Sequence, residues 1–206
     1  MGVFPLVKAG LVCVCLAGCA VAGMGASTPP ATYNLATPAL TGTPFPRWPI
    51  QLTVLRPTAM RALDTDRIVV MAPGGRLSYF EDAAWSDRLT GLLQTRIVEA
   101  ARDSKAFLAV LTTQDRVDGD YTLAVEIRAF QVEVGNGPAT AVVTLFAKIV
   151  QERRSRVLAT NEFSARVPAG TDTPASGVAA LQSGFDQAMN ELVRWTASSV
   201  KGRSGA

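Results

Sequence analysis

The sequence predicts an α+β fold, a two-layer sandwich in which one mostly antiparallel sheet carries two helices on one face. The first observation is a series of segments in which apolar and polar residues alternate, as they do in half-buried strands. The second is a pair of longer segments with apolar residues at steps of three and four, the spacing of an amphipathic helix. The third is the order of these segments, because several consecutive strands separate the two helices.

The first part of the folded region is predicted to consist of short strands and loops. Tyr33-Asn34-Leu35 is a candidate edge strand, and the proline-rich stretch 36–49 predicts a loop. Alternation of apolar and polar residues over 50–54 indicates a half-buried strand. Further strands are expected at 67–71 and 77–80, with a turn at Pro73-Gly74-Gly75 between them.

Two amphipathic helices are predicted from their caps and their spacing. Asp82 is the expected N-cap of a first helix that ends near Arg102. Its apolar face is expected to contain Trp85, Leu89, Leu92, Leu93, Ile97 and Ala100. Thr173 is the expected N-cap of the second helix, with Pro174 at the first helical position. The apolar face of this helix is expected to contain Val178, Leu181, Phe185, Met189, Leu192 and Trp195.

The region between the helices predicts a meander of long strands. Strands are expected at 107–111, 121–134, 140–151 and 157–167. The apolar positions of the second strand change parity, which predicts a bulge near Ala129. The cationic cluster 152–156 is expected to be a solvated hairpin turn, and contact with anionic lipid or an acidic partner is the alternative.

The N-terminal segment is typical of a bacterial lipoprotein signal peptide. A short apolar stretch follows Lys8 and ends at Leu16-Ala17-Gly18-Cys19. In this interpretation the Cys19 thiol is joined to a diacylglycerol, the chain is cut before Cys19, and the new amine is acylated. The expected organisation is a signal peptide at 1–18, a lipidated tether at 19–32 and one domain at 33–206. An ordinary secretory peptide that contains cysteines is the alternative.

The composition excludes several kinds of chemistry. The chain has no histidine, and cleavage before Cys19 leaves one cysteine, which is acylated. Ser-His-Asp triads, thiol nucleophiles, disulfides and cysteine zinc sites are therefore excluded. The net charge of +3 gives little support for a nucleic-acid partner. Asp115, Asp118 and Asp120 suggest a calcium site, but their loop lacks the glycine and glutamate of an EF-hand. We therefore expect no metal site, and the sequence predicts no cofactor and no catalytic residue.

Three motifs, in this order, resemble those of the ABC-type transport auxiliary lipoproteins. They are Leu63-Asp64-Thr65-Asp66-Arg67-Ile68-Val69, then Leu77-Ser78-Tyr79-Phe80, then Trp85 followed by Leu89-Thr90-Gly91-Leu92-Leu93-Gln94. The segment from Asp120 and the closing helix also fit, so the resemblance covers nearly the whole mature chain. One departure is Ala84, which precedes Trp85 where the family usually has arginine. Any partner contact of that arginine is missing here.

The resemblance implies a fold similar to the N-terminal domain of TolB, and it implies no catalytic residues. Members of the family accompany MCE-domain proteins and an inner-membrane ABC permease, which move phospholipids or other hydrophobic molecules between the two membranes. The implied function is a non-enzymatic lipoprotein of such a system. Its implied location is the periplasmic face of the outer membrane, since Ala20 follows Cys19 where inner-membrane lipoproteins often have aspartate.

The candidate partner-binding residues come from the resembling motifs and are Asp64, Asp66, Arg67, Tyr79 and Trp85. The alternative for the charged positions is that they only fix the start of the strand at 67–71. The alternative function is an envelope-assembly or scaffold lipoprotein that binds a partner through a sheet edge, with no role in lipid flux. A homo-oligomer also stays open.

Overall fold

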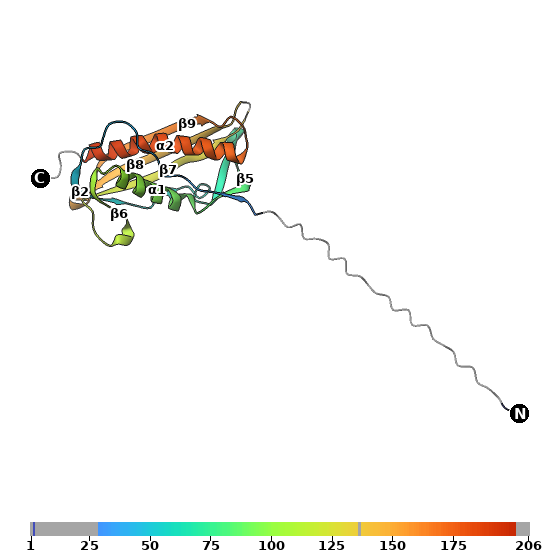
Figure 1. The fold of residues 1–206 in the computed structure, drawn as a ribbon, viewed down its shortest axis with the longest axis horizontal. Helices are drawn as coiled ribbons and strands as arrows, with labels where there is room; N and C mark the ends of the chain where they lie inside the picture. The colour runs from blue at the N-terminus through green and yellow to red at the C-terminus, as the bar shows by residue number, and fades with distance from the viewer. Residues whose placement is uncertain (1, 3–28, 136, 201–206) are drawn as a thin grey trace.

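The computed structural model describes residues 2, 29–135 and 137–200, so Cys19 and the signal peptide lie outside the described residues. Within them the chain forms nine strands and two α-helices in the order drawn in Figure 1. The strands are β1 (Ala31–Tyr33), β2 (Trp48–Val54), β3 (Thr58–Ala59), β4 (Arg67–Ala72), β5 (Arg76–Trp85), β6 (Phe107–Leu111), β7 (Tyr121–Glu133), β8 (Thr140–Gln151) and β9 (Arg156–Pro168). The helices are α1 (Leu89–Asp103) and α2 (Pro174–Ser199), with 3-10 turns η1 (Pro73–Gly75), η2 (Thr113–Asp115) and η3 (Glu152–Arg154).

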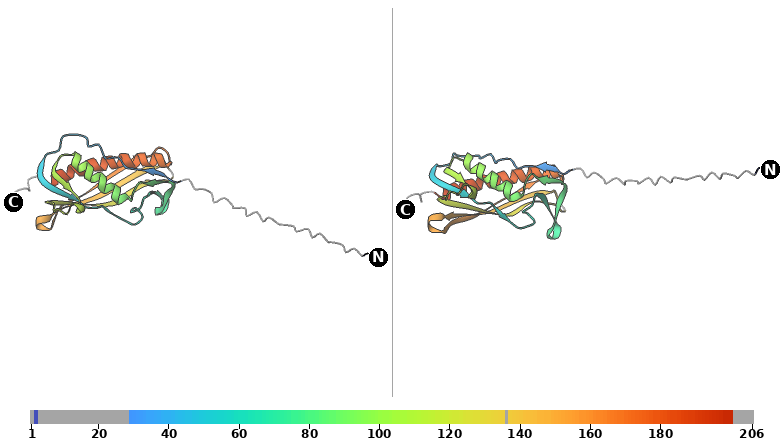
Figure 2. Two further views of the ribbon diagram at one scale, coloured as in Figure 1. Left: turned by 60° about the horizontal axis from the view of Figure 1, so that its bottom comes forward. Right: turned by 90° about the horizontal axis from the view of Figure 1, so that it is seen from below.

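The structure confirms the α+β two-layer class, with both helices on one face of the sheet (Figures 1 and 2). The long strands β7, β8 and β9 form an antiparallel meander, and β4 pairs antiparallel with β5. The sheet is nevertheless partly parallel. β2, β3 and β4 pair in turn along one edge of β7, each parallel to it. The 13-residue β7 is thus the central strand to which both halves of the sheet attach.

The predicted start of the first helix is wrong. Asp82 is not an N-cap, because β5 continues to Trp85 and α1 begins at Leu89. The end of β5 has a partner on each side, since Ala83–Trp85 pair with β1 and Ala84 pairs with Arg67 of β4. These ladder hydrogen bonds keep the segment extended where the local pattern favours a helix. Trp85 therefore belongs to a strand and not to the apolar face of α1.

Several boundaries differ from the expected ones by a few residues. The first strand is 31–33, two residues earlier than expected, and the strand expected at 50–54 begins at Trp48. The two-residue strand β3 had no recognisable pattern in the sequence. The bulge near Ala129 is confirmed by a shift of the β7–β8 register between Ile127 and Ala129. For α2, both the Thr173 cap and Pro174 at the first turn are confirmed.

The core lies between the sheet and the helices and contains a chain of aromatic rings. The Trp85 ring meets the Phe130 ring edge-to-face at 5.9 Å, and Phe130 meets Phe185 in the same way at 6.1 Å. Phe130 and Phe185 are 1% and 0% exposed. This chain of rings joins β5, β7 and α2. The predicted apolar face of α2 is confirmed, with Val178 and Trp195 partly buried at its margin.

Residues 34–45, which we call the strap, cross the outside of the helical layer. Gln182 and Asn190 of α2 bind its backbone: the Ala36 amide donates to Gln182 Oε1 at 2.8 Å, and Asn190 Nδ2 donates to the Ala39 carbonyl at 3.0 Å. Arg96 of α1 donates to Asn34 Oδ1 at 3.2 Å. Leu35, a residue of the strap itself, is 1% exposed and belongs to the hydrophobic core. The strap therefore connects the two helices and seals the core between them.

Candidate functional site

The motif Leu63–Arg67 connects β3 to β4 and is held by the backbone that leads into α1. The Leu89 amide, the first of α1, donates to the Thr65 carbonyl at 3.0 Å. The Trp85 amide donates to the Asp66 carbonyl at 2.6 Å. These two bonds place the motif against the end of β5 and the first turn of α1. This is why residues far apart in the resembling sequence pattern meet in one place.

Asp64 is bound to the first turn of α1 through both carboxylate oxygens. Its Oδ1 accepts a hydrogen bond from the Thr90 hydroxyl at 2.9 Å, and its Oδ2 lies 3.4 Å from Arg88 Nη1. A carboxylate at a helix N-terminus also interacts favourably with the helix dipole. Arg88 is the N-cap residue and supplies no side-chain cap, and Asp64 holds the first turn through the Thr90 and Arg88 side chains. These contacts give Asp64 a structural role.

Asp66 and Arg67 are exposed, and Arg67 packs on Tyr79 from the neighbouring strand. The Arg67 guanidinium lies 4.2 Å from the centre of the Tyr79 ring, a distance at which a cation is attracted to the ring face. The Tyr79 hydroxyl donates to the Ala62 carbonyl at 3.4 Å. We call Asp66, Arg67 and Tyr79 the motif patch. It is a surface of mixed charge and aromatic character, in which Asp66 and Arg67 are exposed and Tyr79 is partly exposed.

Ala84, the departure from the resembling motif, lies opposite Arg67 in the antiparallel β4–β5 ladder. Side chains that face each other in such a pair are close enough to interact, and like charges there are destabilising. In this chain the small alanine leaves Arg67 free to lie over Tyr79.

Trp85 does not belong to the motif patch. Its side chain is 3% exposed and packs against Phe130 in the core. A residue buried to this degree cannot touch a partner without unfolding of β5, so the expectation that Trp85 binds a partner directly does not fit its position. The role that the structure shows for Trp85 in this chain is core packing.

A shallow depression of about 380 Å³ lies beside Asp64. It is lined by Arg56, Pro57, Thr58, Ala59, Asp64, Arg88 and Thr90. Its polar groups already bind one another, since Arg56 Nε donates to the Thr90 hydroxyl at 3.3 Å and Arg88 pairs with Asp64. Because these groups are already paired, the depression offers few free polar groups to a ligand.

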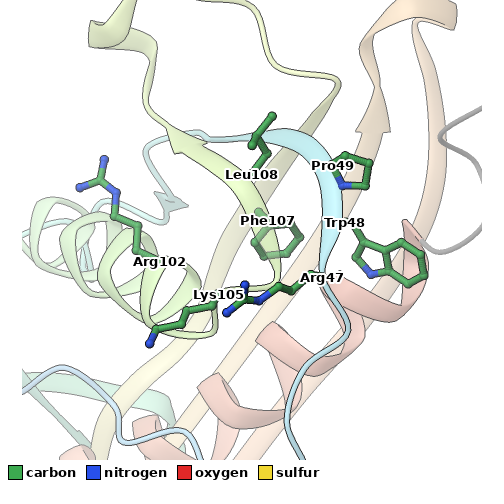
Figure 3. Close-up of a pocket in the computed structure, with 7 residues that line it drawn as sticks. All are labelled: Arg47, Trp48, Pro49, Arg102, Lys105, Phe107 and Leu108. Atoms are coloured by element: carbon green, nitrogen blue, oxygen red, sulfur yellow. The ribbon is translucent and has the colours of Figure 1, made fainter.

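A larger groove of about 590 Å³, shown in Figure 3, was not predicted from the sequence. It is lined by Arg47, Trp48, Pro49, Arg102, Lys105, Phe107 and Leu108. They come from β2 and the residue before it, the last turn of α1, the loop after α1, and β6. We call it the β6 groove. Its lining residues come from segments about 60 positions apart, which meet because Trp48 pairs with Phe107. The charge-free strand 107–111 was the one local signal in the sequence.

The cations of the β6 groove differ in their partners. Arg102 Nη2 donates to the Val110 carbonyl at 3.0 Å. Arg102 also contributes to the lowered pKa values of Glu99 and Asp115, which result chiefly from hydrogen bonds with Thr37 and Thr112. The side chains of Arg47 and Lys105 have no ion-pair or hydrogen-bond partner among the described residues. The groove therefore offers two cationic side chains without an ion-pair partner among the described residues, beside apolar side chains. Asp103 lines an adjoining pocket together with both cations.

Neither surface carries an arrangement typical of metal or membrane chemistry. In the part of the chain that the structure describes, no three acidic, histidine or cysteine side chains are placed to hold a metal ion. Within the same residues, neither helix combines the length and the apolar character that a membrane crossing requires.

Comparison with known proteins identifies relatives in sequence and in structure. An uncharacterized protein of Bradyrhizobium diazoefficiens is 31% identical over 182 residues, which are 86% of this chain and 48% of that protein. The chain thus spans about half the length of this curated relative. A crystal structure from Xanthomonas campestris has a TM-score of 0.78 at 28% identity and covers 85% of this chain and 100% of that chain. A Chlamydia trachomatis structure, with a TM-score of 0.53 at 8% identity over 75% of this chain and 99% of that chain, shares the fold alone.

A protein-family model also matches most of this chain. The model of the ABC-type transport auxiliary lipoprotein component matches residues 33–193, which is nearly all of the folded part of the chain. This family is an auxiliary component of transport systems and is not an enzyme class. Its members are lipoproteins, which indicates a membrane-anchored location in the cell envelope. The chain belongs to the ABC-type transport auxiliary lipoprotein family.

Proposed function

We propose that this lipoprotein is a non-enzymatic component of an MCE/ABC-type system that moves lipids between the inner and outer membranes. Its direct partner is an MCE-domain protein, which in turn joins the inner-membrane ABC permease. The acyl chains on Cys19 hold it at the periplasmic face of the outer membrane.

Family membership over residues 33–193 is the observation that carries this proposal. The proposal also fits the physical properties of the described chain, which offers no membrane-crossing helix. A body of this kind contributes to transport through contact with another subunit. The motif patch is the surface we assign to that contact, because Asp66 and Arg67 are exposed and Tyr79 holds Arg67 in place.

Affinity purification of the native lipoprotein from envelope extract tests the proposal. We expect an MCE-domain protein and ABC components to copurify. The double variant Asp66→Ala with Arg67→Ala should reduce their recovery, since interface contacts of importance contribute more than about 1 kcal/mol each. Gln187→Ala, an exposed substitution on α2, is the matched control and should leave recovery unchanged.

The second candidate function is a scaffold lipoprotein that binds a partner through a sheet edge without a role in lipid flux. The unpaired apolar edge of β6 favours it. Recovery of the lipoprotein without any MCE or ABC component, together with unchanged outer-membrane lipid asymmetry and detergent sensitivity after gene deletion, would exclude the transport function and leave the scaffold.

A further inference from the structure

We propose that the β6 edge and its groove bind an extended acidic segment of a partner protein, which adds a strand to the sheet. This inference deepens the proposed function by naming a second contact surface and the chemistry of its occupant. It rests on that function only for the identity of the protein that supplies the segment.

The first argument is that β6 is an edge strand whose own residues carry no charge. It ends the sheet path β1-β5-β4-β7-β2-β6 and pairs with β2 on one side. Its five residues, Phe107 to Leu111, carry no charge, and the Leu108 side chain is 70% exposed. Exposed edges of this kind readily pair with another strand, and proteins normally blunt them with charged residues.

The edge strand β9 shows the contrast within the same sheet. Arg166 of β9 pairs with Glu133 at 2.5 Å, and Glu162 pairs with Arg128 at 2.6 Å. These charges lie along the strand and oppose pairing with a further strand. On β6 one carbonyl, that of Val110, is occupied by Arg102. The segment from Phe107 to Ala109, which borders the groove, is the part left for pairing.

The second argument is the charge at the mouth of the groove. Arg47 and Lys105 flank the start of β6 and have no anionic partner among the described residues (Figure 3). A strand whose outward side chains include aspartate or glutamate would pair with both cations while its backbone bonds to β6. Apolar side chains of the same strand would lie beside Leu108.

The third argument concerns the origin of this segment. The parts of the chain outside the described residues are 1, 3–28, 136 and 201–206, and none of them contains Asp or Glu. Within residues 1–206, no segment outside the described residues is therefore acidic. A second copy that paired through β6 would bring a like-charged Arg47, Arg102 and Lys105 to the same edge, which is unfavourable. A different protein is the occupant that the charges favour.

The position of the groove also favours a protein over the membrane that holds the lipid. The first described strand, β1, and β6 lie at opposite ends of the sheet order and of the body (Figure 1). The 26-residue α2, about 39 Å long at 1.5 Å per residue, runs along the body between these ends. A body tethered through β1 thus presents its β6 end away from the anchor.

The probe for the test is a fluorescent ten-residue peptide that alternates valine and glutamate. It is titrated into the purified lipoprotein in detergent and followed by fluorescence anisotropy, while hydrogen exchange is followed at the β6 amides. We expect binding with increased protection of Phe107–Ala109. Reversal of both groove charges, Arg47→Glu with Lys105→Glu, should weaken binding about tenfold or more. The matched control reverses Arg153 and Arg154, which are exposed in η3 and do not line the groove.

Two control peptides separate strand addition from simple charge attraction. The same peptide with N-methylated backbone amides keeps its charge but cannot form the ladder, so it should lose most of its affinity. A valine–lysine peptide should not bind. Equal binding of the N-methylated peptide, equal loss in the η3 control, or no binding of the acidic peptide would each overturn the proposal.

The remaining outcomes identify a different occupant. Protection of β6 that grows with lipoprotein concentration in the absence of peptide would assign the edge to a second copy. Binding to phosphatidylglycerol vesicles that needs Arg47 and Lys105, with no peptide binding, would assign it to lipid. Failure of the peptide experiments with copurification of the MCE protein would refute this surface alone. Peptide binding without MCE recovery would refute the proposed partner alone.

Discussion

Gly119 lies at a point where the turn before β7 touches the backbone of β2. A Cβ atom at this position would lie 3.0 Å from the Gln51 carbonyl oxygen and 3.1 Å from the Thr53 amide nitrogen. The adjacent Asp120 amide donates to that same Gln51 carbonyl at 2.8 Å. A side chain here therefore has to push apart two backbone segments that are hydrogen-bonded to each other.

We expect Gly119→Ala to lower the free energy of unfolding by about 1–3 kcal/mol, the usual cost of overpacking. Gly137→Ala is the control, because a Cβ atom there meets no atom within 4 Å. Denaturant titration of both variants measures the difference. Equal stability of the two variants would show that the turn relaxes away from β2.

Asp64 and Asp66 should behave differently although they are two residues apart. Asp64 accepts hydrogen bonds from Thr90 and Arg88, whereas the Asp66 side chain is exposed. Asp64→Ala should destabilise the protein by about 1–3 kcal/mol, the cost of leaving the buried Thr90 hydroxyl without its acceptor. Asp66→Ala should leave stability unchanged and act on partner recovery alone. Thermal unfolding checks the first expectation, and a stable Asp64→Ala variant would contradict the structural role.

At the scale of elements, α2 shows which features of a helix can be predicted from the local sequence pattern. Its cap, its first-turn proline and its apolar face were all predicted, because each depends on neighbouring residues of one helix. The start of α1 was not, because β1 and β4 on either side decide that residues 83–85 stay in a strand. The β6 groove was not predicted for the same reason: Arg47 and Lys105 meet through the pairing of β2 with β6.

The packing of α2 leads to a direct test. Phe185 is fully buried and meets the Phe130 ring at 6.1 Å, so its truncation leaves a cavity in the centre of the core. Phe185→Ala should lower the free energy of unfolding by about 3–5 kcal/mol. Gln187→Ala, on the exposed side of the same helix, should change it by less than about 0.5 kcal/mol. Similar effects of the two substitutions in a denaturant titration would show that the buried side of α2 is misassigned.

The strap should make part of the stability dependent on pH. The pKa of Glu99 is lowered from its ordinary value of 4.5, chiefly by a hydrogen bond from the Thr37 hydroxyl of the strap and further by Arg96, while burial opposes the shift. Folding thus favours the ionised carboxylate. Its contribution is complete above pH 4.5 and is lost as the pH falls through the lowered pKa.

Glu99→Gln should therefore be less stable than the wild type at pH 7, by under about 1 kcal/mol because the carboxylate is partly exposed. The difference should shrink as the pH falls below 4.5, where the wild-type carboxylate is also neutral. Urea titrations at several pH values measure it. Glu191→Gln, exposed on α2 with no ion pair among the described residues, is the control and should match the wild type at pH 7. A constant difference between the Glu99 variant and the wild type at all pH values would exclude the charge as the cause.

At the scale of the whole molecule, attachment to the membrane is expected to depend on one residue outside the described part of the chain. Cys19→Ser should abolish incorporation of radiolabelled palmitate and release the folded body from the membrane fraction. Acyl chains contribute about 0.8 kcal/mol per buried methylene, and the described residues offer no membrane-crossing helix in their place. Wild-type protein that takes up no label and fractionates as soluble would refute the lipid anchor.

The α+β class was predictable because it follows from the sum of many short patterns, while the parallel half of the sheet was not. β2, β3 and β4 align along β7 although they are about 60 to 70 residues from their partners, for example Leu52 with Tyr121 and Val69 with Gln131. The local sequence pattern of a strand does not determine which distant strand it pairs with. The residues of the motif patch were candidates from the sequence because they stand in the resembling motifs. Trp85 was a candidate for the same reason, but it is buried in the core, so the motifs alone do not separate exposed residues from packing residues.

The strap has a consequence for the order in which the protein is made and folded. Its hydrogen bonds join residues that are far apart in the chain, with 146 positions between Ala36 and Gln182 and 151 between Thr43 and Arg194. At translation rates of roughly 5–20 residues per second, these α2 side chains are synthesised roughly 7–30 s after the strap. Leu35 and the core beneath it therefore remain uncovered until the last helix arrives. A nascent chain whose apolar surface stays exposed for this time is expected to bind a holding chaperone. Docking of α2 covers that surface and should end the binding.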